Sequence, residues 1–343
     1  MLHQVGLSHD TGILGRLTLD SKFFRTFLAV LCLASFASAA IYHQTFKVGR
    51  QPTHIAVNIP TNRVYVDNVL DNTVSVIDLN VGQVTATVPL ASRPAGLAVN
   101  QATNRYYVSI QGGVAVYDGV DNSLVTTIAV SGTPSVIAIN PNNNFVYVED
   151  IADNEVHVID GISNQVIAEL PVSHPGNGIV INRRSNQVFV SSASSSGGSV
   201  SVFDGSTNLL VNTFTLPGNP SFTYLASLDQ FNDLYAITQP AGGGTYSFSL
   251  VDETSGALLN QIPLQGKPSG VIAMGISTDE VITNDGISSV EFMFQNATGI
   301  SCKVQVGHGP AGMGIFFPGS SWEVVVANRL DNTVALLFGA PCH

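Results

Sequence analysis

A short strand–turn–strand pattern returns along this 343-residue chain at a nearly regular interval. Its clearest copy is residues 62–78, NRVYVDNVLDNTVSVID. β-Branched and aromatic residues form two runs there, and Asp67-Asn68 and Asp71-Asn72 between them tolerate the backbone angles of tight turns. A Gly/Pro turn precedes each of seven copies, and the prolines of these turns step by 42, 40, 41, 45, 48 and 42 residues.

A repeat in the low forties with four short strands per unit is typical of β-propeller blades. We predict an all-β, seven-bladed β-propeller with four antiparallel strands per blade. The strands are apolar on both faces, as expected where each blade is buried between two neighbours. In blade one the predicted strands are 55–58, 63–67, 73–78 and 84–89. The blades start near residues 52, 94, 134, 175, 220, 268 and 310.

The two ends of the repeat array complete each other. The seventh repeat offers only three strands, at 312–316, 323–327 and 333–338, before the chain stops. Residues 41–48 form an unassigned strand whose alternation matches that of a fourth strand. The N-terminal strand of the mature chain is therefore predicted to close the ring, which removes exposed sheet edges.

The segment before that strand has the form of a secretory signal. Lys22 and Arg25 precede the apolar run FLAVLCLASFA at 27–37, and a small-x-small site ends at Ala39. The run has about 11 residues, whereas a membrane-spanning helix needs roughly 20. We therefore predict a signal peptide at 1–39 and a secreted, extracellular or periplasmic propeller at 40–343, with no transmembrane segment and a monomeric state. An uncleaved anchor is the alternative.

Charge and cysteine content narrow the class further. Without residues 1–40 the chain keeps 10 basic and 22 acidic residues, a net charge of −12, from 13 and 24 in the whole sequence. Nucleic-acid binding usually needs a basic stripe, so nucleic acid is excluded as a partner. Cys302 and Cys342 are the two cysteines that remain. The architecture places both on the same rim, and they form a candidate disulfide in an oxidising compartment.

The repeats resemble the YVTN repeat of the YncE-like seven-bladed propellers. The resemblance rests on segments such as Tyr65-Val66-Asp67-Asn68, Tyr147-Val148-Glu149-Asp150 and Asp331-Asn332-Thr333-Val334, and covers residues 41–343. It implies the propeller fold in a secreted or surface-layer protein. It implies almost nothing about the ligand.

Several polar residues have a structural interpretation. Five aspartates recur where the third strand closes, and their carboxylates are expected to accept hydrogen bonds from turn amides. The glycines at 197–198 and 242–244 are predicted hairpin turns, and His43 and His157 are expected to be packing or edge residues. The aspartates are Asp78, Asp118, Asp160, Asp204 and Asp252.

The loops that lead into the blades and the turns between second and third strands share one face of a propeller, around its central opening. Such a face is the default ligand site, although charged side chains in loops are often only solvated. The leading loops concentrate basic and imidazole groups, and nearby turns add carboxylates and another cation. The candidate binding residues are Arg50, His54, Arg93, His174, Lys267, His308, Asp67, Asp150 and Arg329.

These residues favour a non-enzymatic scaffold that binds a protein, glycan or small ligand on its loop face. The wider propeller class suggests an alternative: a lactonase- or lyase-like enzyme acting in the central funnel. A surface-layer role is a third hypothesis. No cofactor is predicted. A divalent metal held by His54, His174 and His308 from three blades is a weaker hypothesis, because their spacing forms no local ligand motif.

Overall fold

The computed structural model describes residues 42–174, 176, 178–194, 197–216, 220–228, 233–240, 243–273, 280–293, 298–316 and 322–339. The chain divides into two compact units, Met1–Ala39 and Ala40–His343. The first unit, with the predicted signal peptide, lies outside the described residues.

The described residues form seven four-stranded antiparallel sheets. Blades one and two are β2 (Pro52–Asn58), β3 (Arg63–Asn68), β4 (Thr73–Asp78), β5 (Gln83–Pro89), and β6 (Gly96–Asn100), β7 (Arg105–Ile110), β8 (Gly113–Asp118), β9 (Leu124–Ala129). Blades three and four are β10 (Pro134–Asn140), β11 (Phe145–Asp150), β12 (Glu155–Asp160), β13 (Gln165–Pro171), and β14 (Ile179–Asn182), β15 (Gln187–Ser194), β16 (Gly197–Asp204), β17 (Leu210–Phe214). Blades five and six are β18 (Ser221–Leu228), β19 (Asp233–Gln239), β20 (Ser247–Asp252), β21 (Leu258–Pro263), and β22 (Pro268–Ala273), β23 (Glu280–Asn284), β24 (Ser289–Met293), β25 (Ile300–Gln305). Blade seven is β26 (Pro310–Phe316), β27 (Trp322–Asn328), β28 (Thr333–Gly339) and β1 (Tyr42–Lys47).

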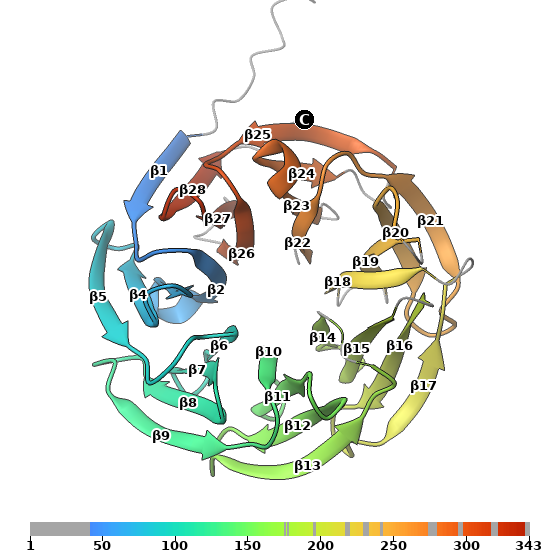
Figure 1. Ribbon diagram of the computed structural model, residues 1–343, viewed down its shortest axis with the longest axis horizontal. Coiled ribbons are helices and arrows are strands. Elements are labelled where there is room, and N and C mark those ends of the chain that lie inside the picture. The colour runs from blue at the N-terminus through green and yellow to red at the C-terminus, as the bar shows by residue number, and fades with distance from the viewer. Residues whose placement is uncertain are drawn as a thin grey trace, which may run out of the picture. The chain divides into compact units, whose positions relative to one another are not determined.

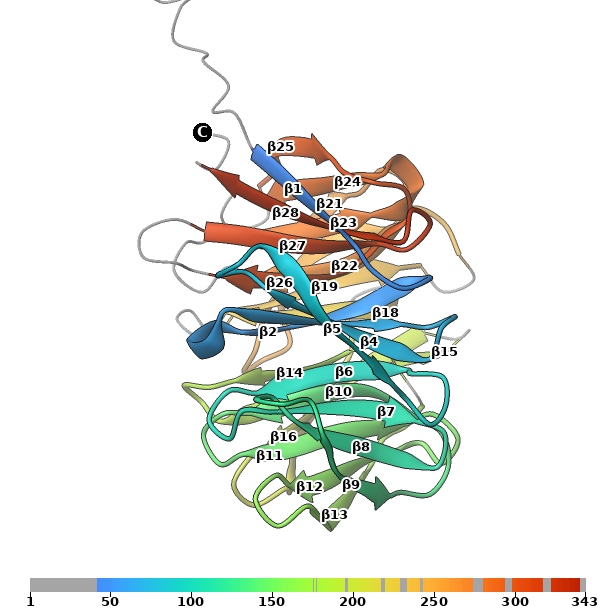
Figure 2. The ribbon, with the colours of Figure 1, turned by 90° about the vertical axis from the view of Figure 1, so that its left-hand side faces the viewer.

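The seven sheets stand around a common centre (Figure 1). The first strand of each blade lies innermost and the fourth outermost, and Figure 2 shows the same sheets from the side. Two 3-10 turns, Ile59–Thr61 and Asp285–Ile287, are the only helical elements of the described residues. No helix among the described residues is long and apolar enough to cross a membrane. The predicted seven-bladed propeller is confirmed.

The ring is closed by β1. It pairs antiparallel with β28, in a register that sets Phe46 opposite Val334 and Lys47 opposite Thr333. Phe46 is buried and packs into the apolar cluster that joins blades one and seven. Two segments from opposite ends of the sequence thus complete one sheet, and the ring has no unpaired edge at this point.

Burial follows the order of strands within a blade. In β3, β7 and β11 every residue after the first is buried, because these strands are covered on both sides by neighbouring blades. The outer strands alternate: in β5 the pattern runs exposed, half-buried, exposed along most of its length. The apolar runs of the second strands are therefore the core between blades.

Tyrosines and asparagines link consecutive blades. The hydroxyl of Tyr107 donates to the Gly161 carbonyl of the next blade at 3.1 Å, and Tyr65 and Tyr106 stack across blades one and two at 4.4 Å between ring centroids. At the end of the first strands, the side-chain amide of Asn58 donates to Asn104 at 2.7 Å and that of Asn100 to Asn144 at 3.1 Å. The repeated Tyr and Asn residues of the sequence thus stabilise the ring itself.

The turn aspartates behave as predicted. Asp78, Asp118, Asp160, Asp204 and Asp252 each accept hydrogen bonds from backbone amides two or three residues further on.

Two local predictions were wrong. Asp67 and Asn68 are not turn residues: they end β3 and are completely buried, and the left-handed backbone angle of that turn belongs to Asn72, with φ of 51°. Gly197 and Gly198 begin β16 and do not form the turn. Gly243 and Gly244 do lie between β19 and β20, with φ of 98° and 132°.

Cys302 lies on β25 and is disulfide-bonded. Cys342, its predicted partner, lies outside the described residues, so the pairing stays a prediction.

Candidate functional site

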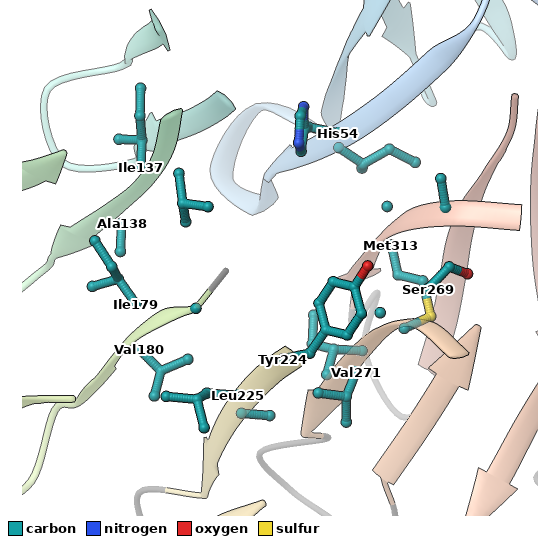
Figure 3. Close-up of a pocket in the computed structure, with 18 of the residues that line it drawn as sticks. His54, Ile137, Ala138, Ile179, Val180, Tyr224, Leu225, Ser269, Val271 and Met313 are labelled. Atoms are coloured by element: carbon teal, nitrogen blue, oxygen red, sulfur yellow. The ribbon is translucent and has the colours of Figure 1, made fainter. Parts of the chain in front are cut away.

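The centre of the ring is a channel of about 780 Å³. Its lining comes from the first strand of every blade and is mostly aliphatic. Figure 3 shows Ile137, Ala138 and Ile179 on one side of the opening, with Met313 across from them. Leu225 and Tyr224, consecutive residues of β18, lie beside each other. The volume lies in the range of small-molecule sites, which are also mainly apolar.

Strand register explains why charged residues gather at one mouth of this channel. The first residue of the inner strand pairs with the last residue of the second strand: Pro52 with Asn68, Pro268 with Asn284, and Pro310 with Asn328. The loops that lead into the blades and the turns between second and third strands therefore lie on the same face, as predicted. His54, Lys267, Asp285 and Arg329 all line the channel from that face.

His54 is held by a buried carboxylate. Its Nδ1 lies 2.6 Å from Oδ2 of Asp67, and Oδ1 of Asp67 accepts the backbone N–H of His54 at 2.7 Å. Burial disfavours the charged imidazole, but the charge of Asp67 and its hydrogen bond outweigh that effect and raise the pKa of His54. The His54 side chain is still 36% exposed. Nε2 forms no hydrogen bond among the described residues.

Arg329 forms an ion pair across two blades. Its Nη2 lies 2.5 Å from Oδ2 of Asp285, which follows β23 of blade six. The Arg329 side chain is half-buried and lines the channel beside His54 and Lys267. Asp285, the one carboxylate among the described residues that line the channel, is thus already neutralised by an arginine.

A second hollow of about 450 Å³ adjoins the mouth. It shares Thr53, His54 and Arg329 with the channel and adds Arg93. Arg93 and Lys267 are exposed, and among the described residues neither forms an ion pair. Among the described residues, the mouth therefore carries two cations without ion pairs, a paired arginine and a histidine whose pKa is raised.

Other predicted site residues lie elsewhere. Arg50 pairs with Asp71 at 2.6 Å and His308 with Asp331 at 3.0 Å, at equivalent positions of blades one and seven. Neither Arg50 nor His308 lines the channel or the second hollow, and His174 is exposed and lines neither as well. Asp67 reaches the site only through His54. Asp150 is fully buried and faces His157.

The structure does not bring His54, His174 and His308 together. Among the described residues, a single group of at least three potential metal ligands has its ligand atoms within 4.8 Å of one another: Glu155, His157 and Glu169. His157 had been interpreted as a packing residue, and it is buried. The sequence signal for this group was the alternation Glu155-x-His157, which puts both side chains on one face of a strand.

Glu149 was also overlooked as a titrating group. It occupies in blade three the position of Asp67 in blade one and is fully buried. Its Oε1 accepts the Gly176 N–H at 2.6 Å and its Oε2 accepts the Ser135 hydroxyl at 3.1 Å. Burial raises the pKa of Glu149 to about 7, the two hydrogen bonds oppose this, and the charge of Asp150 adds to it.

No protein-family model matches the chain. No curated protein matches it either. Among solved structures it is similar to a chain of "Kuenenia stuttgartiensis Hydrazine Synthase", with a TM-score of 0.77 and 17% sequence identity over 87% of this chain and 98% of that chain. At this identity the similarity shows a shared fold alone. The YVTN-like family assignment stays a prediction.

Proposed function

We propose that this propeller is a binding protein for a small amphipathic anion, such as a carboxylate with an aliphatic or aromatic body. The apolar body lies in the central channel, and the carboxylate lies at the mouth among His54, Arg93, Lys267 and Arg329. The observation that carries the proposal is the pair of cations without ion-pair partners, Lys267 and Arg93, beside an aliphatic cavity.

Energetics favour this ligand class over a neutral one. Burying apolar ligand surface contributes about 25 cal/mol per Å², and the channel wall is aliphatic on most sides. Arg and Lys beside a partly dehydrated carboxylate form charge-assisted hydrogen bonds, which are the stronger kind. The chain has a formal net charge of −11, but that repulsion is screened beyond about 8–10 Å at physiological salt, so the local cations dominate at the mouth.

A small ligand also fits the geometry better than a protein or a glycan does. Four charged or titratable groups, His54, Lys267, Asp285 and Arg329, line one mouth of a central cavity of about 780 Å³. We further propose that the protein is exported and acts outside the cytoplasm. The disulfide at Cys302 supports this location, because such bonds persist in oxidising compartments.

Calorimetric titration of the chain from residue 40 with octanoate tests the proposal. We expect binding that weakens about 5- to 10-fold in Lys267→Ala and in Arg93→Ala, which corresponds to roughly 1–1.4 kcal/mol per lost contact. Lys47→Ala is the matched control: Lys47 is exposed on the outermost strand β1, and its removal should leave the affinity unchanged. Equal affinity in all four proteins, or no binding to any of them, would overturn the proposal.

The same titration should depend on pH. Protonated His54 adds a positive charge at the mouth, so above about pH 5, where the carboxyl group of octanoate is ionised, affinity should fall as pH rises through the raised pKa of His54. Asp67→Asn should lower that pKa, because it removes the neighbouring negative charge. NMR titration of the His54 ring in both proteins measures the shift.

A second candidate function is acid–base catalysis by His54. The contact between Nδ1 and the buried Asp67 leaves Nε2 for a substrate, an arrangement typical of a general base. A lactonase- or lyase-like reaction in the channel would use it. Hydrolysis of a panel of lactones by the wild type, lost in His54→Gln, would favour this function, and absence of turnover while octanoate still binds would reject it.

A further inference from the structure

A second polar cluster lies on blade three, away from the channel lining. Glu155 and His157 are on β12, Glu169 is on β13, and Asp150 ends β11. Asp150 pairs directly with Glu155, and His157 pairs directly with Glu169. Because directly paired residues and residues two apart share a face of a sheet, three adjacent strands present these four side chains on one side.

The four side chains are close enough to act together. Nε2 of His157 lies 3.4 Å from Oδ2 of Asp150 and 3.5 Å from Oε1 of Glu155, and Nδ1 lies 4.0 Å from Oε1 of Glu169. One oxygen each of Glu155 and Glu169 and a ring nitrogen of His157 all fall within 4.8 Å of one another. Ligand atoms of a tetrahedral zinc ion are about 3.3 Å apart, so small side-chain rotations close the set.

Asp150 fixes the imidazole. Its Oδ1 accepts backbone N–H groups of Thr133 at 2.9 Å and Ala152 at 2.8 Å, and its Oδ2 faces His157. These hydrogen bonds hold the Asp150 carboxylate in place beside His157. A carboxylate behind a histidine is the usual partner of a metal-bound imidazole, because it sets the tautomer and the ring orientation.

An unsatisfied nitrogen points to a missing ligand. The His157 side chain is 2% exposed, and its Nδ1 is buried with no hydrogen-bond partner, although it faces the side of the cluster where Glu169 lies. A buried polar atom without a partner is costly, and native structures seldom contain one without a reason. A metal ion bound there would use this lone pair.

The net negative charge of the cluster also favours a bound cation. Three carboxylates surround one imidazole, and no Lys or Arg forms an ion pair with any of the three among the described residues. A divalent cation would neutralise this charge.

We propose that Glu155, His157 and Glu169 bind a zinc ion, with Asp150 orienting the imidazole. One nitrogen and carboxylate oxygens are a ligand set that Zn²⁺ accepts, and water completes the coordination. Glu155 and Glu169 are 22% and 61% exposed at the side chain, so the ion can enter from the outer surface. The site would tie β12 to the outermost strand β13, and it is independent of ligand binding in the channel.

The test uses untagged protein from residue 40, stripped with EDTA and dialysed. Calorimetry with ZnCl₂ should show one equivalent bound, elemental analysis after gel filtration should recover it, and the melting temperature should rise with zinc by mass action. MgCl₂ and CaCl₂ should give no comparable effect, because both ions prefer an all-oxygen ligand set.

Variants separate this site from adventitious binding. Glu169→Gln and Glu155→Gln change exposed or half-exposed side chains and should each weaken zinc binding at least 10-fold. His157→Gln should abolish it, but this residue is buried and the variant can fail to fold, so the two glutamate variants carry the decision. His308→Gln is the control, because His308 is an exposed histidine beside a carboxylate. Absence of stoichiometric binding, binding unchanged in both glutamate variants, or binding lost in His308→Gln would overturn the proposal.

Discussion

Asparagine and aspartate side chains decide much of the backbone of this chain. Asn72, Asn104, Asn144 and Asn186 all adopt left-handed angles, with φ between 51° and 63°, and each follows a strand that must turn. Asn reaches this region at lower cost than other residues with a Cβ. Of these residues, Asn72 was predicted to lie in a turn, and its left-handed angle agrees with that prediction.

Residues whose role depends on distant neighbours were harder to predict. Asp67 looked like a turn residue because Asp favours turns, yet it is buried and holds His54, which lies 13 positions earlier. Glu149, which occupies the equivalent position in blade three, is buried and accepts a hydrogen bond from Gly176 of the next blade. Neither contact is visible in a local pattern, because both depend on how strands pair and blades pack.

Glu149 should make the stability of the ring depend on pH. Its pKa rises from about 4.5 in the unfolded chain to about 7 in the ring, so at intermediate pH the unfolded state binds fewer protons. The contribution is fully present below pH 4.5 and is lost as pH rises through 7. Between pH 5 and pH 8 the wild type should lose about 2–3 kcal/mol of unfolding free energy relative to Glu149→Gln. Urea unfolding at both pH values measures this, and parallel pH curves for the two proteins would contradict it.

At the level of the strand, the sequence predicted where strands lie along the chain better than which residues contact each other between sheets. The short apolar runs correctly located the second strand of each blade. In β3, β7 and β11 these strands are buried on both faces, as expected. That Tyr65 would stack on Tyr106 and Tyr107 would reach Gly161 could not be predicted, because these contacts join different sheets. The repeat period predicts the strands of each blade, whereas the contacts between blades depend on how neighbouring blades pack.

The asparagine links between blades should be worth measuring individually. Asn100 is buried: its Oδ1 accepts the amides of Ala102 and Thr103, and its Nδ2 donates to Asn144. Asn100→Ala leaves these groups unpaired and should cost about 2–4 kcal/mol. Asn80→Ala, in an exposed turn of blade one, should stay within about 1 kcal/mol. Similar shifts in the denaturation midpoints of both variants would show that the links contribute nothing special.

For the whole molecule, closure of the ring by β1 was predicted because the seventh repeat lacked a fourth strand and residues 41–48 formed a strand that belonged to no repeat. The pairing of β1 with β28 follows this logic. Only some of the predicted binding residues on the loop face meet at the channel mouth. His54, Arg93, Lys267 and Arg329 meet at the channel mouth, whereas Arg50, His174 and His308 share the face but do not line it. Topology alone gives the face, and the lengths and directions of individual side chains decide which of them reach the centre.

The contribution of β1 to ring closure should appear as a difference in stability between variants of two adjacent residues on this strand. Phe46 is buried in the cluster between blades one and seven, so Phe46→Ala should cost about 3–5 kcal/mol. Lys47→Ala, one residue later and exposed, should change stability by about 0.5 kcal/mol or less. Chemical denaturation of both variants provides the comparison. A small effect for Phe46→Ala would mean that the ring does not depend on this strand.

The channel should select an anion with an apolar body over a neutral ligand of similar size. Calorimetric titration of the wild-type chain from residue 40 with octanoate and with 1-octanol at about 0.15 M salt compares two eight-carbon ligands that differ in head group and charge. The cationic mouth formed by His54, Arg93, Lys267 and Arg329 should make octanoate bind at least 10-fold more tightly, a difference of about 1.4 kcal/mol. Equal affinities, or preference for the alcohol, would contradict the account.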